Sequence, residues 1–239
     1  MAAGRRSDVQ ETPLVVVTGG GRGVGFEVAC ALAREHGAQV IAVSRDVGRW
    51  SSMTDDPRVE PLAADLATEE GIHSVVRAVG ERPLFGLVNN AGMLLKKELG
   101  AWTAPDMGAL FSMNASVPLL LTQGLLPALH KNNGAHVVNI SSMGGFQGSV
   151  KFQGLSGYSA SKAALACLTE CLAVELASTE VRCNCLCLGA VDTAMLREAF
   201  PGYQAPTDAQ TMGRFIAEFL LGGHKLLNGK VLPVSLSTP

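Results

Sequence analysis

Tyr158 and Lys162 are the residues of this chain whose types and spacing point most directly to chemistry. They lie four positions apart in Gly157-Tyr-Ser-Ala-Ser-Lys162, a segment that opens a predicted helix, and this spacing places them one turn apart on the same face. A tyrosine ordinarily titrates at about pH 10, but a neighbouring ammonium favours the phenolate and lowers the pKa. We therefore expect Tyr158 to exchange a proton with a substrate oxygen, although the same spacing also occurs in ordinary pairs on helix surfaces.

Two hydroxyl groups precede this helix, at the end of an apolar run. The run Val137-Val-Asn-Ile140 is typical of a buried strand and is followed by Ser141 and Ser142. In open α/β sheets, ligands bind beside the carboxyl ends of the strands. We expect Ser142 to hydrogen-bond the substrate oxygen and to hold it near Tyr158, with Ser141 as the competing choice. The alternative is that both serines only cap backbone groups at the end of the strand.

A glycine-rich turn, Thr18-Gly-Gly-Gly-Arg-Gly-Val-Gly25, lies directly after the first predicted strand and opens the first predicted helix. Glycines let a backbone turn sharply and approach a pyrophosphate, whose charge is stabilised by the free N–H groups and dipole of a helix N-terminus. This placement predicts a dinucleotide site, whereas a lone glycine-rich motif is equally consistent with a flexible loop. The positive nicotinamide ring of such a cofactor would favour the Tyr158 phenolate further.

The residues after the second predicted strand distinguish between the two nicotinamide dinucleotides. An acidic residue there accepts hydrogen bonds from the ribose of NAD(H), but this chain has Ser44 and Arg45. A serine hydroxyl can hydrogen-bond a 2′-phosphate, and an arginine presents a planar fork of donors that suits phosphate. We expect NADP(H) in preference to NAD(H), with Arg22 of the glycine-rich turn as a second cation. Alternatively, either arginine is a solvated surface charge.

Composition argues against several other classes of protein. The 239 residues include 19 basic and 21 acidic side chains, with a formal net charge of −2, so no broad basic field attracts nucleic acid or an anionic membrane. Arg5 and Arg6 are not followed by the apolar run of a signal peptide, and no uninterrupted apolar stretch reaches the roughly 20 residues that cross a bilayer. We therefore expect a cytoplasmic protein with no membrane span and no nucleic acid partner.

Five of the six cysteines form two regularly spaced groups. Cys183, Cys185 and Cys187 would share one face of an extended strand, and Cys167 and Cys171 lie one helical turn apart. Small apolar packing explains both groups, whereas zinc sites usually recruit spaced pairs of cysteine and histidine. We expect no metal, and we expect reduced thiols because no secretory signal directs the chain to an oxidising compartment.

Alternating strands and helices must position these side chains. The predicted strands are 14–18, 39–43, 58–62, 84–88, 135–140, 181–187 and 230–234, and the predicted helices are 23–35, 69–79, 104–130, 157–178 and 208–220. Thr68 is an expected N-cap, and Gly37 and Gly80 are expected to follow helix ends. This alternation is typical of βαβ units. We expect an α/β fold, a single-domain Rossmann-like doubly wound parallel sheet of about seven strands with helices on both faces, over residues 13–239 after a flexible segment at 1–12.

Four motifs occur together, in one order along the chain. They are Thr18-Gly-x-x-x-Gly23-x-Gly25, Asn89-Asn90-Ala91-Gly92, Ser142 and Tyr158-x-x-x-Lys162. With these motifs, the chain from Leu14 to about Val234 resembles the short-chain dehydrogenase/reductase family of the single-domain, Tyr-x-x-x-Lys type. The resemblance implies an enzyme that moves a hydride between NADP(H) and a small carbonyl or alcohol substrate.

The resemblance also implies roles for individual residues. The catalytic residues would be Asn114, Ser142, Tyr158 and Lys162, with Lys162 tuning Tyr158 and contacting the cofactor ribose. Asn114 would kink its helix and hold a water that joins Lys162 to solvent. The cofactor contacts implied by the motifs and by the resemblance are those of Thr18, Gly19, Gly21, Arg22, Gly23, Val24, Gly25, Ser44, Arg45, Asp65, Leu66, Asn90, Ala91, Gly92, Tyr158, Lys162, Gly189, Val191 and Thr193.

Within that set, the resemblance distributes the contacts along the cofactor. Asp65 would contact the adenine, and Asn90 and Ala91 would shape the pocket beside the ribose. Val191 and Thr193 would hold the nicotinamide amide and the pyrophosphate, through a backbone contact and a hydroxyl contact respectively.

Three features depart from the family pattern and concern the substrate side of the site. Leu188 stands where the family commonly has proline before Gly189, which would loosen that turn. Ser142 precedes Tyr158 by 16 residues, a few more than the resemblance leads us to expect, and the added length predicts an unusual pocket rim. The lid, roughly 194–207, is short, and residues 227–233 replace the usual final glycine-rich turn.

The leading hypothesis is an NADP(H)-dependent oxidoreductase that reduces a carbonyl group to an alcohol or catalyses the reverse. The alternatives are a cofactor-sensing or scaffold protein with the same fold and no turnover, and an epimerase or dehydratase that uses hydride transiently. Packing of helices 104–130 and 157–178 against a second copy, as the resemblance implies, predicts a homo-oligomer, either a dimer or a tetramer. Aromatic residues near the expected mouth predict an apolar pocket, and they are Phe146, Phe152, Phe200 and Tyr203.

Overall fold

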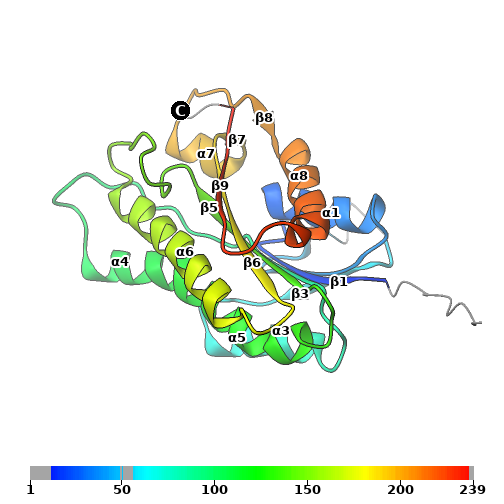
Figure 1. Ribbon diagram of the computed structural model, residues 1–239. Helices are drawn as coiled ribbons and strands as arrows, with labels where there is room; N and C mark the ends of the chain where they lie inside the picture. Colours follow the sequence, from blue (N-terminus) through cyan, green and yellow to red (C-terminus); the bar gives the residue numbers. More distant parts are fainter. Residues whose placement is uncertain (1–11, 49, 51–55, 237–239) are drawn as a thin grey trace, which may run out of the picture.

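The computed structural model describes residues 12–48, 50 and 56–236. Its centre is a seven-stranded sheet in the order β3-β2-β1-β4-β5-β6-β9, in which every neighbouring pair is parallel (Figure 1). The strands are β1 (Leu14–Thr18), β2 (Gln39–Ser44), β3 (Val59–Ala63), β4 (Gly86–Asn89), β5 (His136–Ser142), β6 (Arg182–Leu188) and β9 (Val231–Val234). The predicted α/β fold with a doubly wound parallel sheet is confirmed.

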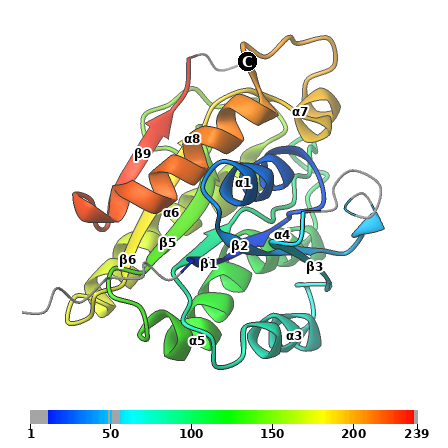
Figure 2. The same cartoon turned by 90° about the vertical axis from the view of Figure 1, so that its right-hand side faces the viewer.

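Helices cover both faces of this sheet, as predicted. On one face lie α1 (Gly23–Arg34) and α8 (Ala209–Gly222), and on the other lie α3 (Glu69–Val79), α5 (Val117–Leu129) and α6 (Ser156–Glu175). Figure 2 shows α1 and α8 on one side of the strands and α3 and α5 on the opposite side. The central strands are apolar on both faces because each face is covered by helices, and Val15, Val16 and Val17 of β1 are fully buried.

The strand order reverses between β1 and β4. From β1 the chain builds outward through β2 and β3, then crosses to β4 and builds outward in the other direction. A crevice forms outside the carboxyl ends of the strands at such a reversal, and it is the usual ligand site of open α/β sheets. The glycine-rich turn after β1 and the Asn90 segment after β4 both lie at this point.

Most predicted elements are present, with bounds that differ by at most three residues. The Thr68 hydroxyl accepts a hydrogen bond from the Gly71 amide at the start of α3 (3.0 Å), and Gly80 ends that helix with a φ of 58°. Gly37 follows α1 with a φ of 67°. These three capping predictions are confirmed. The flexible segment predicted at 1–12 lies, up to residue 11, outside the described residues, and a single domain over 13–239 stays a prediction.

The predicted helix 104–130 is wrong as a single α-helix. It consists of α4 (Ala104–Phe111), the π-helix η1 (Ser112–Ser116) and α5. The apolar pattern continues through the break, so periodicity alone does not reveal it. The wider turn surrounds Asn114, whose side chain is held by hydrogen bonds to other segments, and π turns of this kind are frequent at functional sites.

Several short elements were not predicted, because two to six residues carry no measurable periodicity. They are β7 (Val191–Asp192), which pairs with β8 (Thr207–Asp208), the helix α7 (Ala194–Ala199), and the 3-10 helix η2 (Gly223–Lys225). The β7–β8 pair closes the base of an excursion that contains α7. This excursion corresponds to the short lid expected at about 194–207.

The helical stretch Ala104–Leu129 is long and apolar enough to cross a membrane, by length and composition alone, with a mean hydropathy of 1.3. It is the one such stretch in the part of the chain that the structure describes. Its side chains Leu121, Leu125 and Leu129 are buried in the core beneath the sheet. A core helix passes the same test, so the expected absence of a membrane span stays a prediction.

The cysteines divide into a buried group and an exposed pair. Cys183, Cys185 and Cys187 of β6 are fully buried, as expected for small apolar packing, whereas Cys167 and Cys171 of α6 are exposed. Packing is therefore confirmed for the first group and is wrong for the second, because their turn of α6 faces away from the sheet. The expectation that no metal is bound stays a prediction.

A buried polar cluster joins the amino ends of β5 and β6 to the C-terminal part of the chain. The His136 ring contacts the Leu220 carbonyl through Nδ1 and the Asn184 amide nitrogen through Nε2, both at 2.9 Å. Asn184 Oδ1 accepts from the Lys230 amide and its Nδ2 also donates to the Leu227 carbonyl, each at 3.0 Å. Because Lys230 fixes the orientation of the Asn184 amide, His136 Nε2 accepts a hydrogen bond and Nδ1 carries the proton. The ring is therefore neutral.

This arrangement predicts a pH dependence of stability. Burial lowers the pKa of His136 to about 4, and the ring of His224, 5.7 Å away, acts in the same direction. In the unfolded chain the pKa returns to about 6.5, so between those values the unfolded state binds a proton that the folded state excludes. The free energy of unfolding should fall as the pH decreases from about 6.5 to about 4, by about 3 kcal/mol from this group. Urea unfolding at several pH values measures the slope.

The variant His136→Asn, which retains a donor toward Leu220 but cannot be protonated in this range, should show a shallower slope whatever its absolute stability. The matched control is His36→Asn, since His36 is exposed. Equal slopes for His136→Asn and the native chain would contradict the assignment.

Candidate active site

A cavity of about 970 Å³ lies along the carboxyl ends of the strands at the reversal between β1 and β4. It is bordered by the glycine-rich turn, the segments after β2, β3 and β4, the end of β5, the start of α6 and the lid. Most of the predicted site residues line it, and they are Gly19, Arg22, Gly23, Val24, Ser44, Arg45, Asp65, Leu66, Asn90, Ala91, Gly92, Ser142, Tyr158, Lys162, Gly189, Val191 and Thr193. Residues as far apart in the chain as 19 and 193 thus meet in one hollow.

The glycine-rich turn is packed so tightly at Gly19 and Gly21 that a side chain would not fit at either position. Gly19 has a φ of 67°, and a Cβ atom there would lie 2.8 Å from the Asn90 side-chain nitrogen. A Cβ on Gly21 would collide with the Ser44 hydroxyl and lie 2.6 Å from the Asp46 carbonyl oxygen. Such a turn leaves its cavity side open to close approach by a ligand, as a pyrophosphate site requires.

Thr18 connects this turn to the segment after β4. Its hydroxyl donates to the Val88 carbonyl (3.2 Å) and accepts from the amides of Asn90 (3.0 Å) and Ala91 (2.9 Å). Asn90 Nδ2 in return donates to the Thr18 carbonyl at 3.0 Å. Thr18 is buried and does not line the cavity. Its hydrogen bonds instead hold two walls of the cavity in a fixed position relative to each other.

Gly21 and Gly25 also lie behind the cavity wall rather than on it. Gly25 is in such close contact with the Gly19 carbonyl and the Asn90 side chain that any Cβ would overlap both. The motif therefore contains two kinds of residue. Gly19 and Gly23 face the cavity, whereas Gly21 and Gly25 let the turn pack against β2 and β4.

The N-terminus of α1 points its unpaired N–H groups toward the cavity. The N-cap Arg22 is extended, makes no side-chain capping bond, and is followed by no acidic residue in the first turn. The first amides of a helix lack partners within the helix and attract anions. The residues present fit a dinucleotide pyrophosphate at this position.

The end of the cavity beside β2 contains two cations. Arg22 and Arg45 are exposed and line the cavity, and neither side chain has an ion-pair or hydrogen-bond partner among the described residues. The Ser44 hydroxyl packs against the glycine-rich turn. Asp65 lines the cavity from beyond β3, where its carboxylate accepts from the Ala67 amide at 3.1 Å. The site thus has unpaired positive charge beside the second strand.

Trp50 is a residue that sequence reasoning missed here. Its indole nitrogen donates to the Gly20 carbonyl at 3.1 Å, and its ring packs on Phe26 of α1 with centroids 4.4 Å apart. Trp50 therefore supports the glycine-rich turn from beneath. The tryptophan follows a polar segment after β2, so no periodic pattern indicated that it would be buried.

The opposite end of the cavity is closed by the segment after β6. Thr193 Cγ2 would lie 3.7 Å from a Cβ on Gly23, so this segment crosses in front of the glycine-rich turn. Leu188, expected to loosen the turn, is the last residue of β6, and its carbonyl accepts from the Met143 amide at 2.8 Å. The Gly189 amide donates to the Val234 carbonyl at 2.9 Å. Neighbouring segments thus hold the turn on both sides, and the expectation of a looser turn than one with proline stays a prediction.

Tyr158 and Ser142 meet at the middle of the cavity. Tyr158 is largely buried at the start of α6, and its phenol interacts with the Ser142 hydroxyl. Burial raises the pKa of Tyr158, and the hydrogen bond with Ser142 lowers it in part. For the chain by itself, the net direction is opposite to the one expected from Lys162 alone, because removing the phenolate from water outweighs nearby attraction.

Lys162 lies one turn further along α6 and is almost completely buried. Its ammonium donates to the Ile140 carbonyl at 2.9 Å, and burial lowers its pKa to about 8. A Cβ on Gly92 would lie 3.2 Å from Lys162 Nζ. The segment after β4 therefore approaches this ammonium closely, and a side chain at Gly92 would be a tight fit.

The two serines at the end of β5 have different partners, because successive residues of a strand face opposite sides. Ser141 is buried and donates to the Lys162 carbonyl at 2.8 Å. Ser142 faces Tyr158 and accepts from the Gly144 amide at 3.1 Å. The geometry favours Ser142 as the residue that can contact a substrate oxygen, and Ser141 as a residue that positions α6.

Asn114 is fully buried in η1 and is held by three hydrogen bonds. Its Oδ1 accepts from the Met93 amide (2.8 Å), and its Nδ2 donates to the Met93 carbonyl and to Ser161 Oγ, each at 2.9 Å. The side chain therefore joins the segment after β4 to α6 beside Lys162. The expected kink is present as the π turn, whereas the expected water relay stays a prediction.

The substrate side of the cavity contains residues that no motif indicated. Met93 and Leu94 follow the Asn-Asn-Ala-Gly motif, Met143 and Leu155 lie at the two ends of the loop after β5, and all four line the cavity. Among the expected aromatic residues, Phe152 and Phe200 line it, whereas Phe146 and Tyr203 do not. Leu94 could have been predicted as a lining residue, because it lies just after the Asn-Asn-Ala-Gly motif.

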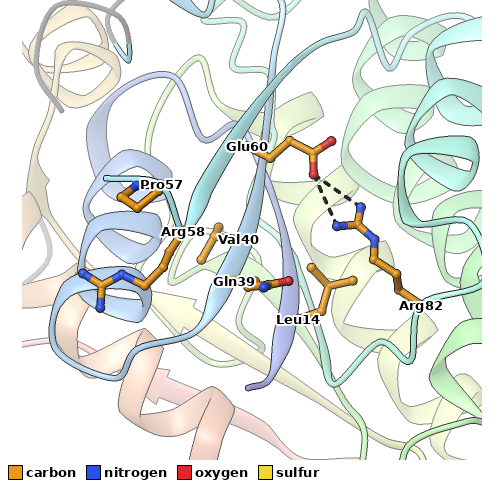
Figure 3. A pocket seen from close by; sticks show the side chains of 7 residues that line it. All are labelled: Leu14, Gln39, Val40, Pro57, Arg58, Glu60 and Arg82. Atoms are coloured by element: carbon orange, nitrogen blue, oxygen red, sulfur yellow. Dashed lines mark hydrogen bonds and ion pairs between the residues drawn. The ribbon is translucent and has the colours of Figure 1, made fainter. Parts of the chain in front are cut away.

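A second hollow, of about 220 Å³, lies at the opposite, amino ends of β1, β2 and β3. Figure 3 shows Arg82 facing Glu60 across it, with Arg58 pointing away from them. Arg82 pairs with Glu60 at 3.3 Å, and Arg58 pairs with Asp56 at 2.8 Å. Partly exposed pairs of this kind are common on protein surfaces, and none of the predicted site residues lies there.

Comparison with known proteins agrees with this geometry. Residues 13–204 match the family model described as short chain dehydrogenase. An uncharacterized oxidoreductase of Staphylococcus aureus (strain MW2) is 26% identical over 209 residues, which cover 85% of this chain and 88% of that protein. Among solved structures, the Pseudomonas aeruginosa RhlG/NADP active-site complex is 27% identical with a TM-score of 0.83, covering 93% of this chain and 94% of that one.

A second solved structure shows the fold alone, because its sequence is more distant. The 3-ketoacyl-(acyl-carrier-protein) reductase of Brucella melitensis, complexed with NADH, is 23% identical with a TM-score of 0.81. The superposition covers 93% of this chain and 96% of that one.

The packing at Gly25 generates a prediction for nucleotide binding. Because a Cβ there would overlap the Gly19 carbonyl and the Asn90 side chain, Gly25→Ala should displace the turn and raise the dissociation constant for NADPH by at least about tenfold. Titration of nucleotide fluorescence measures the constant, and circular dichroism checks that the fold persists. The matched control is Gly108→Ala in α4, where a Cβ meets nothing within 4 Å. Unchanged NADPH affinity in folded Gly25→Ala would refute the prediction.

Proposed function

Because the chain belongs to the short chain dehydrogenase family, we propose that it is an NADP(H)-dependent oxidoreductase that interconverts a carbonyl group and an alcohol. The observation that carries the proposal is the contact between the Tyr158 phenol and the Ser142 hydroxyl in the wall of the cavity. The buried Lys162 ammonium lies one helical turn away. A proton donor, an oxygen-orienting hydroxyl and a cation thus border one space.

In the proposed reduction, each of these residues has a separate task. Ser142 hydrogen-bonds the carbonyl oxygen and holds it against Tyr158. Tyr158, kept neutral by its burial, donates its phenolic proton to that oxygen as the alcohol forms. Lys162, fixed by the Ile140 carbonyl, stabilises the phenolate left behind. Bound NADPH supplies the hydride, and NADP+ accepts it in the reverse direction.

The proposal also includes a route by which Tyr158 regains its proton after each reduction. Asn114 connects the segment after β4 to the start of α6 beside Lys162, so it fixes the surroundings of the ammonium. We assign it a positioning role, and a water held near it would connect Lys162 to solvent.

The preference for NADP(H) is supported by charge at the ribose end. Arg22 and Arg45 line the cavity, their side chains have no partners among the described residues, and a 2′-phosphate would pair with both. The acidic residue that would bind the ribose of NAD(H) is replaced by Ser44. The NADP complex of the Pseudomonas protein is consistent with this choice.

A homo-oligomer in the cytoplasm is also part of the proposal. Leu119 and Leu120 of α5 and Val174 of α6 are exposed to 36%, 43% and 75%. Exposed apolar side chains on two helices of one face suit packing against a second copy. Light scattering, which gives the molar mass in solution, measures whether the chain is a dimer or a tetramer.

Removal of the Tyr158 hydroxyl tests the proposed chemistry. Tyr158→Phe should lower kcat by at least about a thousandfold, because it removes the proposed proton donor, and should leave the NADPH dissociation constant nearly unchanged. The rate is followed through NADPH absorbance with the carbonyl compound that the native enzyme reduces fastest. Tyr203→Phe, which removes the chain's other tyrosine hydroxyl from outside the cavity lining, should retain most activity. Full turnover by Tyr158→Phe would rule out the mechanism.

Charge reversal at Arg45 tests the cofactor preference. The native protein should bind NADPH at least about tenfold more tightly than NADH, and Arg45→Asp should reverse that order by repelling the 2′-phosphate and accepting from the ribose hydroxyls. Dissociation constants for both nucleotides measure it. The control is Arg34→Asp, an exposed residue at the far end of α1. Equal affinity of the native protein for the two nucleotides would overturn the preference.

A further inference from the structure

Three separate segments of the chain contribute apolar walls to the part of the cavity beyond Tyr158 and Ser142, and Ala109, Ser112 and Met113 line the cavity as well. One wall follows β4, one follows β5, and the third is the lid with α7, which lies at the same end of the molecule as β7 and β8 (Figure 1). Their apolar lining side chains are Met93, Leu94, Met143, Phe152, Leu155, Met195, Leu196, Ala199 and Phe200.

The lysines on the first two walls each have a partner within the chain. Lys96 donates to the Ala199 carbonyl (2.7 Å), Lys97 pairs with Asp106 (2.6 Å), and Lys151 donates to the Phe146 carbonyl (2.6 Å). None of the three lines the cavity. The segments after β4 and β5 thus contain three lysines near the mouth of the cavity. The ammonium group of each is bonded to another residue of the chain.

The other charged residues that line this end of the cavity lie in the lid or just before it. Each of them has an ion-pair partner or is exposed to water. Asp192 and Arg197 form an ion pair, and both side chains are more than half exposed. Glu198 is exposed and remains hydrated. Among the described lining residues, Lys162 is then the one buried charge near Tyr158, and the proposed mechanism already uses it.

Contacts of aromatic rings and a backbone hydrogen bond connect the three walls at the mouth of the cavity. Phe152 and Phe200 meet edge to face with centroids 5.1 Å apart, and the Lys96 ammonium lies 5.1 Å from the centroid of Phe200. The Lys97 amide donates to the Gly154 carbonyl at 2.9 Å. A substrate that reaches Tyr158 is therefore enclosed by apolar side chains, which favour apolar surface and leave a charged group without a partner.

We propose that the substrate is an uncharged ketone or aldehyde with an apolar body, aliphatic or aromatic, rather than a keto acid, a phosphorylated carbonyl compound or a sugar. The inference rests on the proposed function, since it concerns the occupant of the same site. Specificity arises because a carboxylate or phosphate entering this end loses its water and finds no cation free to replace it.

The test compares two ketones that differ at one substituent, which is an uncharged methyl ester in one and a carboxylate in the other. Methyl 4-acetylbenzoate and 4-acetylbenzoate share a ring and a ketone, and kcat/KM with NADPH should be at least about tenfold higher for the ester. Dihydroxyacetone, which is uncharged and polar, should be reduced no better than the acid. If the acid or dihydroxyacetone is reduced as efficiently as the ester, the substrate class is wrong and the proposed function stands.

A variant of the wall connects the preference to these residues. Phe152→Ala should raise KM for the ester at least about fivefold with little change in kcat, and Phe152→Leu should restore most of the affinity. The matched control is Phe215→Ala on α8, which removes a phenylalanine that is 41% exposed outside the cavity. An unchanged KM in Phe152→Ala contradicts the proposal.

A binding experiment distinguishes failure of the proposed function from failure of the inference about the substrate class. If NADPH binds and no carbonyl compound is reduced, the proposed function fails. The substrate-end inference is then tested by saturation-transfer NMR of the ester and the acid in the presence of NADP+. Signals from the ester that disappear in Phe152→Ala support an apolar site, and stronger signals from the acid overturn it.

Discussion

The hydroxyl group of Thr18 joins the two halves of the sheet at the point where the strand order reverses. It donates to the Val88 carbonyl and accepts from the amides of Asn90 and Ala91, so the glycine-rich turn after β1 and the segment after β4 are held as one wall. The same segment continues to Met93, whose backbone is bonded to Asn114. Buried and partly buried hydrogen bonds on this one segment therefore connect the expected pyrophosphate position with the surroundings of Lys162. Buried polar networks of this kind specify one arrangement because each unmade bond is costly.

Burial of two ionisable groups determines what the centre of the cavity can do. Burial raises the pKa of Tyr158 and lowers that of Lys162 to about 8, so neither residue is charged as readily as in water. The Lys162 ammonium is stabilised by the Ile140 carbonyl, and Tyr158 retains the proton that a reduction consumes. The proposed chemistry follows from this balance: the phenolate is unfavourable in the resting site and becomes accessible as charge rearranges beside it.

The sequence predicts those features that depend on neighbouring residues. The buried run of β1, the glycine-rich turn that follows it and the one-turn spacing of Tyr158 and Lys162 are local, and the structure brings them together as expected. Features that depend on distant contacts were missed. The Thr18 hydroxyl bonds residues 70 to 73 positions away, Trp50 reaches back to Gly20, and the π turn at Asn114 arises from bonds to Met93 and Ser161. The sign of the Tyr158 pKa shift was also missed, because it depends on burial, which spacing does not reveal.

The central claim is that this cavity transfers a hydride between a nicotinamide and a carbonyl carbon beside Tyr158 and Ser142. Label transfer tests it most directly. NADPH carrying deuterium at C4 of the nicotinamide, on one face and then on the other, is incubated with the enzyme and a ketone that it reduces, and the alcohol is analysed by mass spectrometry and NMR. The account predicts one deuterium on the carbinol carbon from one of the two labelled cofactors and none from the other. An alcohol that contains no deuterium from either cofactor would contradict it.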